Sequence, residues 1–491
     1  MEKFYITTAI PYVNASPHVG HSLEFVEADV IARHEKALKK DVYFLSGTDE
    51  NAIKNFQAAE KAGIGVQEFV DKNSSAFEQV LKALNISNNQ FIKTTEERHK
   101  KGAQALWLST DKDDLYKKTY RGLYCVGCEQ FYEPGDLNEK GECFEHPGKP
   151  LETVEEENYF FRLSKYQSWL RDLISSGKLK IVPEIRKNEV LSVIDKGLQD
   201  FSVSRPVERS HGWGVPVPGD EKQTIYVWYD ALSNYITALG YPDEKSDLYK
   251  KYWLQSDVRL HVIGKGISRF HAIYWPAMLQ SAGLPLPTEE FIHGYVTAEG
   301  QKISKTIGNV IDPLEVIKKY GTDPLRYYLL REIPAYLDGD FSFKRFEERY
   351  NSDLANGLGN FSARVLSLAN SLGSVKKGEV SKDVEEKINE IRQKVNENLK
   401  EFKFHEALAS IWELLSFGDA KVNSEKPWAV EDQSKKSEIV FNLLTILDNV
   451  ASLVDPFMPE TSRKITECII WEGDSIKAKR GEVLFLRLPK S

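Results

Sequence analysis

Cysteine and net positive charge are both scarce in this chain, and each shortage excludes a class of protein. Four cysteines among 491 residues cannot form the disulfide framework of a secreted scaffold. The formal net charge of −8 argues against sequence-independent binding of nucleic acid through bulk charge. Any recognition of nucleic acid is therefore expected to be local and to depend on shape.

Internal repeats, low-complexity tracts and an apolar signal region are missing as well. Residues 1–3 lead directly into an expected strand, and no stretch reads as a membrane span. We therefore expect a cytoplasmic protein without a membrane partner. The length of 491 residues allows about three domains of roughly 150 residues each.

The first motif is a strand, a loop and a helix. Residues 4–8 are β-branched and aromatic, and apolar residues recur with helical spacing over residues 19–30. Ser16 and Pro17 suit the N-cap and the first helical position. The helix is therefore expected to begin at Pro17.

Two histidines, His18 and His21, would then lie three residues apart on one face of that helix, beside its free amide groups. Such a helix end attracts phosphates, and imidazoles can stabilise charge on a transferring phosphoryl group. The alternative is a helix cap with two surface histidines.

A second strand, residues 41–45, leads to Asp49. Strand, helix, strand implies a parallel pair with a right-handed crossover, so Asp49 and the first loop should meet at the carboxyl edge of one sheet. A carboxylate there can hold an ammonium group. The alternative is that Asp49 caps the next helix.

Soft metal ligands follow in two short knuckles. Cys125 and Cys128 form the first, and Cys143 and His146 form the second. Four sulfur and nitrogen ligands satisfy tetrahedral zinc and leave no position open for water, so this spacing predicts one structural Zn²⁺ ion in an inserted subdomain. The alternative is a set of buried cysteines without metal.

The sheet is expected to resume with strands at residues 223–231 and 260–263. The second strand opens a helix on which Ile267, His271 and Trp275 recur every four residues and share a face. A lone histidine there is usually a satisfied core residue, whereas its place at the sheet edge favours a pocket.

A further strand, residues 291–296, precedes a basic loop. Lys302 and Lys305 lie three residues apart on this Gly-flanked loop and can close over a polyphosphate, with the Ser304 hydroxyl as a further donor. Beyond residue 320, apolar residues recur with helical spacing almost to the end of the chain, which predicts an all-α bundle.

Together these motifs resemble the methionyl-tRNA synthetases, a family of class I aminoacyl-tRNA synthetases, from Phe4 to nearly the last residue. His18-Val-Gly-His21 is similar to the family signature His-Ile-Gly-His, and Lys302-Ile-Ser-Lys-Thr306 is similar to Lys-Met-Ser-Lys-Ser. The resemblance implies an α/β fold, a Rossmann-like parallel-sheet catalytic domain split by a zinc-binding connective insert, followed by an all-α anticodon-binding bundle. The expected boundaries are 1–115 and 223–295 for the two catalytic halves, 116–222 for the insert, 296–350 for the signature-loop and stem-contact region, and 351–491 for the anticodon-binding domain.

The resemblance also implies the reaction. Methionine and ATP, accompanied by Mg²⁺, give methionyl-adenylate and pyrophosphate, and the methionyl group then passes to the 3′-terminal adenosine of tRNA(Met). His18, His21, Lys302 and Lys305 would be catalytic, and Ser304 would join them in binding ATP.

Methionine would lie in an apolar aromatic box, where the Tyr12 hydroxyl and a His271 N–H can donate to the thioether. The implied pocket residues are Ala9, Ile10, Tyr12, Asp49, Trp228, Ala231, Leu232, Tyr235, Ile267, His271 and Trp275. Asn360, Arg364 and Trp428 match the family's anticodon readers. Without the resemblance, Trp428 would be expected in the core.

Three positions depart from the family pattern: Asn51 and Ala52, where His-Gly is common, and Gly266, where aspartate is frequent. These departures leave the affinities for substrates open. We expect a monomer, because no segment remains for a C-terminal RNA-binding dimerisation module. The rival interpretations are a class I synthetase for another apolar amino acid and a catalytically silent, synthetase-like RNA-binding protein.

Overall fold

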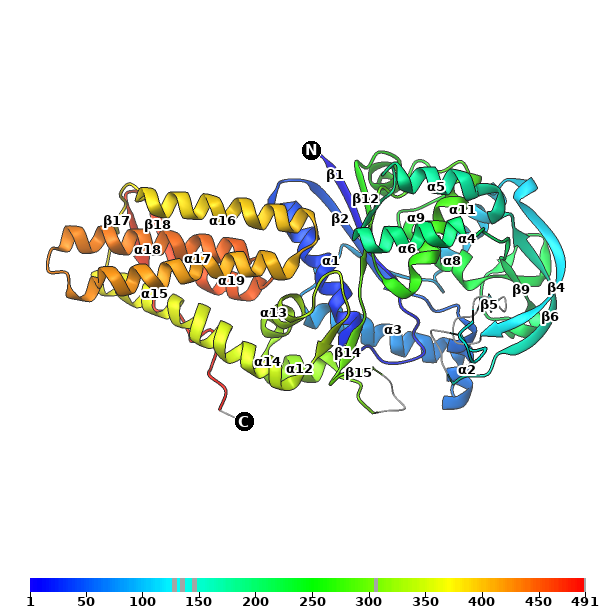
Figure 1. Ribbon diagram of the computed structural model, residues 1–491, viewed down its shortest axis with the longest axis horizontal. Coiled ribbons are helices and arrows are strands. Elements are labelled where there is room, and N and C mark those ends of the chain that lie inside the picture. The colour runs from blue at the N-terminus through cyan, green and yellow to red at the C-terminus, as the bar shows by residue number, and fades with distance from the viewer. Residues whose placement is uncertain (126–129, 133–136, 144–147, 304–307, 490–491) are drawn as a thin grey trace. The chain divides into compact units, whose positions relative to one another are not determined.

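The computed structural model describes residues 1–125, 130–132, 137–143, 148–303 and 308–489 (Figure 1). The chain forms two compact units. The first unit holds residues 1–17, 35–79 and 87–293, and the second holds residues 18–34, 80–86 and 294–491.

A six-stranded sheet forms the centre of the first unit, in the order β3-β2-β1-β12-β13-β7, and every neighbouring pair is parallel. Its inner strands are almost continuously buried, because the faces of a parallel sheet are covered by other elements. The predicted parallel sheet is therefore confirmed. Its strands are β1 (Lys3–Thr8), β2 (Asp41–Thr48), β3 (Gln90–Lys93), β7 (Lys180–Val182), β12 (Val258–Gly264) and β13 (Glu289–His293).

Helices accompany this sheet. They include α2 (Ile53–Ala62), α3 (Val66–Ala83), α4 (Glu97–Ser109), α5 (Gln167–Ser175), α6 (Glu184–Asp195), α8 (Val227–Leu232), α9 (Asn234–Thr237) and α11 (Trp275–Ser281). Short 3₁₀ and π turns, at Lys265–Ile267 and Phe270–Tyr274, carry the chain from β12 into α11.

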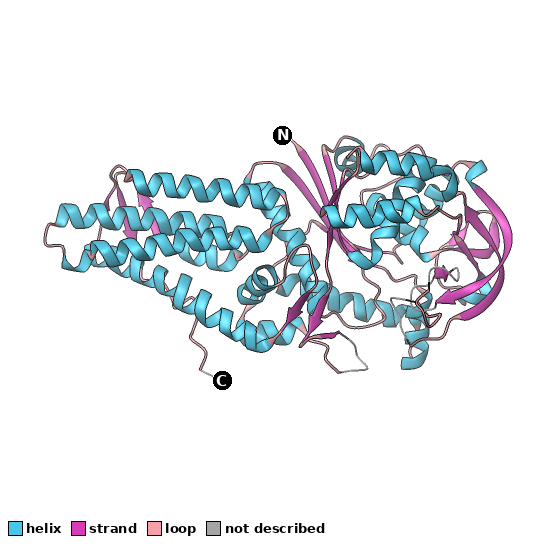
Figure 2. Ribbon diagram, in the orientation of Figure 1, coloured by secondary structure: helices cyan, strands magenta, loops and turns pink. Residues whose placement is uncertain are grey.

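Between strands β3 and β12 of the parallel sheet, the chain also forms two antiparallel sheets. One sheet has the order β5-β4-β6-β8 and a smaller one has the order β10-β11-β9, and Figure 2 shows their strands in magenta. The strands are β4 (Leu115–Cys125), β5 (Gln130–Tyr132), β6 (Glu152–Phe161), β8 (Phe201–Ser202), β9 (Ser204–Pro206), β10 (Pro216–Val217) and β11 (Asp220–Ile225).

Two expected strands were wrong. Residues 223–231 divide between β11, which lies in the small antiparallel sheet, and α8, which begins at Val227. Residues 291–296 divide between β13 and β14 (Val296–Ala298), which belong to different sheets. Both runs are short and apolar, and such runs do not distinguish a strand from a buried helix or reveal a break between strands.

The first helix, α1 (Val19–Ala37), begins two residues later than expected, so Ser16 and Pro17 precede it. The side chain of His18 caps the helix instead, because its Nδ1 accepts a hydrogen bond from the Gly20 N–H at 3.1 Å. Further along α1, Asp29 is fully buried and lies 2.8 Å from the buried guanidinium of Arg326 on α13 (Thr322–Glu332).

Long amphipathic helices dominate the second unit and confirm the predicted bundle. They are α15 (Asn360–Leu372), α16 (Lys382–Lys400), α17 (Phe404–Glu425), α18 (Gln433–Val454) and α19 (Pro459–Thr466). Earlier elements of this unit are α12 (Pro313–Tyr320), α14 (Phe343–Arg349), β15 (Gln301–Lys302) and β16 (Gly339–Phe341). A small sheet of β17 (Val375–Lys376), β18 (Ile469–Glu472) and β19 (Ser475–Ala478) was not expected.

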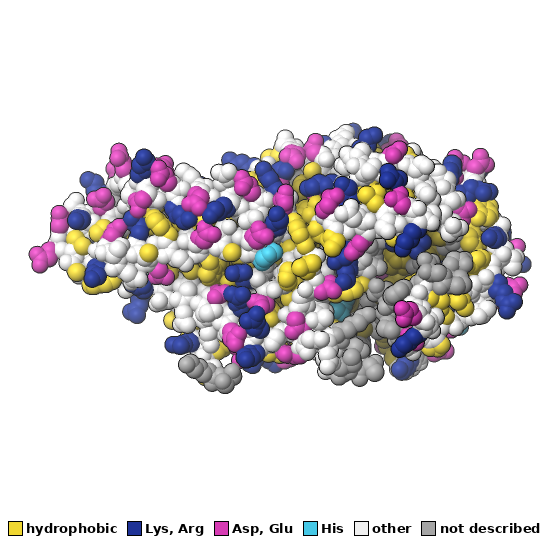
Figure 3. All heavy atoms as spheres, viewed as in Figure 1, with side chains coloured by type: hydrophobic (Ala, Val, Ile, Leu, Met, Phe, Trp, Pro, Cys, Tyr) yellow, Lys and Arg dark blue, Asp and Glu magenta, His cyan; other side chains and the backbone are white. Residues whose placement is uncertain are grey.

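By length and composition, α18 is apolar enough to cross a membrane, with a mean hydropathy of 1.4. However, 67% of its apolar window is buried inside the structure, as expected for a core helix. On the bundle face seen in Figure 3, Lys and Arg side chains are interspersed with Asp and Glu.

Candidate functional site

A group of aromatic side chains gathers where strands β1 and β12 end. These neighbouring strands are followed by loops on one edge of the sheet, the position at which open parallel sheets bind ligands. Tyr12, in the loop after β1, forms a parallel bridge with Asp49, which follows β2. The two loops that the sequence placed together are therefore in contact.

Trp228, on α8, forms one wall of this group. Its ring stacks on Phe270 with 3.7 Å between the centroids and 2° between the planes. Tyr12 meets Trp228 edge to face at 6.2 Å, and His271 does so at 6.4 Å. Phe270 was missed from the sequence because it lies beside His271 in the chain, outside the four-residue repeat. The π turn brings its ring onto that of Trp228.

His271 is held by two hydrogen bonds. Its Nδ1 lies 3.0 Å from the Ile267 carbonyl oxygen, which can only accept, so Nδ1 carries the hydrogen. Burial lowers the pKa of His271 to about 4, so the ring is neutral at pH 7 and Nε2 accepts from the Tyr235 hydroxyl at 2.7 Å. The idea that a His271 N–H donates to the thioether is therefore wrong for this arrangement, because its N–H is already used.

The remaining predicted pocket residues belong to the hydrophobic core around this group. Tyr235 and Trp275 are buried with their ring centroids 6.2 Å apart. Ala9, Ala231 and Leu232 are buried too, while Ile10 and Ile267 are partly buried. A second buried histidine, His261 on β12, lies 4.1 Å from the Tyr235 ring. The sequence does not mark His261 as a candidate for the pocket, because it lies inside a buried strand.

Asp49 is buried, with a relative exposure of 3%. It does not cap the next helix, because α2 begins at Ile53 and has Ala52 at its N-cap position. The Asp49 carboxylate accepts from the backbone N–H of Asn51 at 3.2 Å. The side chain of Asn51 in turn donates to Asp230 at 2.7 Å, so this departure from the family pattern fixes the loop that carries Asp49.

In the second unit, His18 and His21 lie together at the start of α1 with 3.9 Å between ring centroids. The His18 N–H donates to Nδ1 of His21 at 3.1 Å, and the Gly20 N–H donates to Nδ1 of His18. This is the arrangement of a capping box, with histidines in both positions.

Burial lowers the pKa of His18 to about 4 and that of His21 well below its ordinary value. Both rings are therefore neutral at pH 7. Because Nδ1 accepts in each ring, the hydrogen is on Nε2, where it can be donated to a phosphate oxygen. The cap that the alternative expected is therefore present, made by His18 itself, and both histidine side chains are partly buried.

Several predicted residues lie outside what the structure describes. Ser304 and Lys305 fall in a gap at residues 304–307, and only the backbone of Lys302 is described, in β15. Cys128 and His146 also fall in gaps. Their partners Cys125 and Cys143 are buried thiols. The described residues contain no group of three or more side chains able to hold a metal ion.

The bundle contains a cavity of about 1090 Å³ that Arg364 and Trp428 both line. The Trp428 side chain is 55% exposed, so it is not a core residue. Arg364 donates to Asp419 at 3.2 Å and to Asn423 at 2.8 Å. Asn360 is exposed one turn earlier on the same helix, α15.

Basic side chains surround this cavity and give it a positive surface in an acidic chain. Arg463, Lys464, Lys479 and Arg480 line it with Arg364, opposed by two glutamates, Glu467 and Glu482. The four additional basic residues were not found from the sequence, because they come from α19 and from the chain after β19, far from α15 in sequence.

Comparisons with known proteins agree with this architecture. Residues 4–366 match the family described as tRNA synthetases class I (M), and residues 381–490 match the anticodon-binding domain of tRNA ligase. The chain is 42% identical to the methionine–tRNA ligase of Brucella suis biovar 1, over 96% of this chain and 93% of that protein. It is 40% identical to the Thermotoga maritima methionine–tRNA ligase, over 96% of this chain and 76% of that one.

The structure is also similar to solved structures. Mycobacterium tuberculosis methionyl-tRNA synthetase in complex with methionyl-adenylate matches with a TM-score of 0.90 at 38% identity, covering 95% of this chain and 94% of that one. The apo form of the same enzyme matches with a TM-score of 0.84 at 34% identity, covering 100% of this chain and 99% of that one. The chain therefore belongs to the methionine–tRNA ligases, the class I (M) family of tRNA synthetases.

Proposed function

We propose that this protein activates methionine with ATP and transfers the methionyl group to the 3′-terminal adenosine of tRNA(Met). One observation carries the substrate assignment. Tyr12, Trp228 and Tyr235 belong to an aromatic cluster around His271, and the backbone of Tyr12 forms a bridge with that of Asp49, whose side chain is buried.

The first step needs no protein nucleophile, because the methionine carboxylate is already ionised and attacks the α-phosphorus of ATP. The bond from the α-phosphorus to the bridging oxygen breaks, and pyrophosphate leaves. In the second step a hydroxyl of the terminal adenosine attacks the methionyl carbonyl and AMP leaves. The protein therefore contributes positioning and stabilisation of negative charge.

For methionine, the pocket offers ring faces and aliphatic surface to an unbranched side chain, and Asp49 offers a carboxylate to its ammonium group. Ala9, Ile10, Ala231, Leu232, Ile267 and Trp275 complete the apolar surface. Because both nitrogens of His271 are occupied, we propose that the thioether meets ring surfaces there. Such a pocket discriminates by about 1–3 kcal/mol per methylene, so homocysteine is the demanding competitor.

For ATP, we propose that His18 and His21 donate their Nε2 hydrogens to phosphate oxygens. Their neutral rings support this role, since a hydrogen-bond donor at a helix N-terminus stabilises an anion without a second charge. By resemblance to the family, Lys302, Ser304 and Lys305 would bind the leaving pyrophosphate. Mg²⁺ would accompany ATP and neutralise part of its charge.

For zinc, we propose one structural ion held by Cys125, Cys128, Cys143 and His146. Two buried thiols, Cys125 at the end of β4 and Cys143, fit the preference of zinc for sulfur. Bound zinc would hold the insert in its folded form and take no part in the reaction.

For tRNA, we propose that Asn360, Arg364 and Trp428 read the anticodon. An exposed tryptophan beside a basic cavity suits an unpaired base that can stack and a backbone that carries phosphates. We further propose that the protein works as a cytoplasmic monomer. Light scattering at assay concentration tests the oligomeric state.

The decisive experiment is amino-acid-dependent ATP–pyrophosphate exchange with methionine, leucine, isoleucine, valine, cysteine and homocysteine. We expect methionine to drive the exchange. Exchange driven chiefly by another amino acid would support a synthetase of different specificity. No exchange with any of them, from folded and zinc-loaded protein, would favour the catalytically silent RNA-binding protein.

A further inference from the structure

A buried hydrogen-bond network joins the loop that carries Asp49 to the helix that carries Trp228. Its centre is Asp230, a buried residue on α8. One oxygen of the Asp230 carboxylate accepts from the Asn51 amide at 2.7 Å, and the other lies 2.7 Å from Nε2 of His99 on α4. Three segments that are far apart in the sequence therefore meet at one carboxylate.

Asn51 connects this carboxylate to Asp49. The Asn51 side chain donates to Asp230 and also to the Thr94 carbonyl oxygen at 3.0 Å, so both hydrogens of its amide are used. Its backbone N–H donates to the Asp49 carboxylate at 3.2 Å. The Asp49 carbonyl oxygen is held separately, by the Asn55 amide at 3.0 Å. Asn51 therefore acts on the orientation of the Asp49 carboxylate.

His99 anchors the network between two packed helices. It is buried on α4, and its Nδ1 lies 2.7 Å from the hydroxyl of Thr237 on α9. Gly102, further along α4, permits this approach, because a Cβ atom there would lie 2.3 Å from Cγ2 of Thr237. A glycine inside a helix costs stability, so its presence here is explained by the close packing of α4 on α9.

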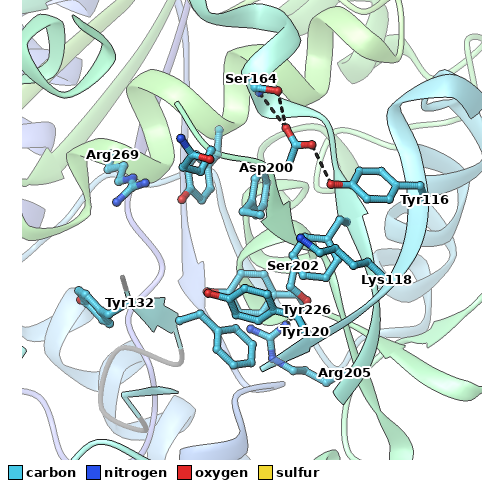
Figure 4. A pocket seen from close by; sticks show the side chains of 15 residues that line it. Tyr116, Lys118, Tyr120, Tyr132, Ser164, Asp200, Ser202, Arg205, Tyr226 and Arg269 are labelled. Carbon is cyan, nitrogen blue, oxygen red and sulfur yellow. Dashed lines mark hydrogen bonds between the residues drawn. The ribbon is translucent and has the colours of Figure 1, made fainter. Parts of the chain in front are cut away.

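Helix α8 is also fixed where it begins. Tyr226, the residue before it, donates its backbone N–H to the Val203 carbonyl oxygen at 2.8 Å. The guanidinium carbon of Arg205 lies 4.2 Å from the centre of the Tyr226 ring, and both side chains line a pocket of about 270 Å³ (Figure 4). Trp228 lies between Tyr226 and Asp230 in the chain, so its position depends on both attachments.

Two parts of the proposed methionine site thus share one support. Asp49 would hold the ammonium group, Trp228 forms an aromatic wall, and Asp230 links the elements that carry them. Movement of either element would leave a buried polar atom without its partner, which is costly. The network therefore fixes the ammonium acceptor relative to the aromatic wall.

We propose that Asn51, Asp230 and His99 are positioning residues that set the affinity for the α-ammonium group of the amino acid. The inference rests on the proposed function, which supplies an amino-acid substrate. None of the three needs to touch that substrate, because Asn51 acts on Asp49 and His99 acts through Asp230. Asn51 stands where histidine is common in the family, so in this chain an amide makes the link to Asp230.

The test compares two inhibitors of ATP–pyrophosphate exchange that differ in the ammonium group. Methioninol has this group, whereas 4-(methylthio)butanoate lacks it. We expect Asn51→Leu to raise the Ki of methioninol and the KM for methionine about 10-fold, because a charge-assisted hydrogen bond loses its geometry. The Ki of 4-(methylthio)butanoate should change by at most about twofold. Equal weakening of both inhibitors would indicate general damage to the pocket and overturn the proposal.

Asn158→Leu is the matched control. Asn158 is also a buried asparagine whose amide donates to a carboxylate, that of Glu156 at 3.1 Å, but it lies on β6. We expect both inhibition constants to remain within about twofold of the wild type. The same selective loss of methioninol binding in Asn158→Leu would contradict the assignment.

His99 gives a second test, which remains available if Asn51→Leu does not fold. We expect His99→Leu to raise the Ki of methioninol about 5-fold and His99→Gln, which can still donate to Asp230, to raise it by at most about twofold. The combined effect of Asn51→Leu and His99→Leu should be smaller than the product of the two, since both act through Asp230. Independent effects would refute this shared route. A wild-type protein without methionine-dependent exchange would instead refute the proposed function.

Discussion

The hydroxyl of Tyr235 lies 2.7 Å from Nε2 of His271 and fixes the state of that histidine. The Ile267 carbonyl oxygen takes the only hydrogen of the neutral ring at Nδ1, so Nε2 must accept from Tyr235. Both groups are buried, and water cannot replace either partner freely. The ring is thus held in one orientation beside Trp228, and in the proposed methionine pocket it would present a fixed surface.

Replacement of Tyr235 by phenylalanine tests this bond. The change leaves Nε2 of a buried histidine without its donor, at a cost of about 1–3 kcal/mol. We expect the KM for methionine in ATP–pyrophosphate exchange to rise, by at most the equivalent of this cost, about 5- to 150-fold, with a smaller change in kcat. Tyr229→Phe is the control, because its buried hydroxyl bonds Thr110, outside the predicted pocket residues. Equal effects of the two changes would contradict a special role for Tyr235.

The low pKa of His271 predicts a dependence of stability on pH. Burial lowers this pKa to about 4 in the folded protein, whereas the ordinary value is 6.5. Between these values the unfolded chain binds the proton and the folded protein does not. The contribution of neutral His271 to the free energy of unfolding is therefore complete above pH 6.5 and is lost as the pH falls toward 4.

The measurement is urea unfolding of the wild type and of His271→Gln between pH 6.5 and 4.5, followed by tryptophan fluorescence. We expect the free energy of unfolding of the wild type to fall more steeply, by up to about 1.4 kcal/mol per pH unit. If the free energy of unfolding fell equally with pH in the wild type and in His271→Gln, His271 would not be held neutral in the folded protein.

Gly20 tests the histidine cap of α1. A Cβ atom at this position would lie 2.9 Å from Cε1 of His18, so alanine must displace the imidazole. We expect Gly20→Ala to lower kcat for adenylate formation about 10- to 100-fold, because catalysis here depends on position. Gly65→Ala is the control, since no atom lies within 4 Å of its new methyl group. Unchanged single-turnover adenylate formation would argue against the proposed role of His18.

Trp428 tests the separation of tRNA recognition from amino-acid activation. Loss of one stacked base costs about 1–3 kcal/mol, so Trp428→Ala should weaken tRNA binding about 5- to 100-fold and leave ATP–pyrophosphate exchange unchanged. Trp471→Ala is the matched control, because Trp471 is 42% exposed but does not line the basic cavity. Filter binding with intact tRNA gives the affinity, and equal losses in both variants would contradict the prediction.

The zinc content of cysteine variants tests the proposed zinc site. We expect the purified wild type to hold about one zinc per chain and Cys125→Ser to hold much less, because a structural site needs all four ligands. Cys468→Ser should retain the wild-type content, since Cys468 lies in the second unit, near β18. The same zinc content in Cys125→Ser and the wild type would reject this set of ligands.

The parts of the fold predicted correctly are those with strong local patterns. Helices α16, α17 and α18 follow apolar repeats that are visible in the chain, and β1, β2 and β12 follow β-branched runs. Errors arose where neighbours far away in the chain decided the outcome. Residues 224–228 have the composition of a strand, yet Tyr226 ends the extended segment and Trp228 lies on a helix.

The amino-acid sequence by itself determined the elements and the chemistry available, because periodicity and motif spacing are local properties. It contained His18 and His21, the residues proposed to bind zinc, and the aromatic residues proposed for the methionine pocket. Tertiary structure alone decided how those groups act. It stacked Phe270 on Trp228 and gave His18 the capping role expected of Ser16. It also directed the N–H of His271 to the carbonyl oxygen of Ile267. The contact of Phe270 with Trp228 joins distant segments, whereas the bonds of His18 and His271 are local but depend on the backbone and side-chain conformations that the folded, partly dehydrated environment selects.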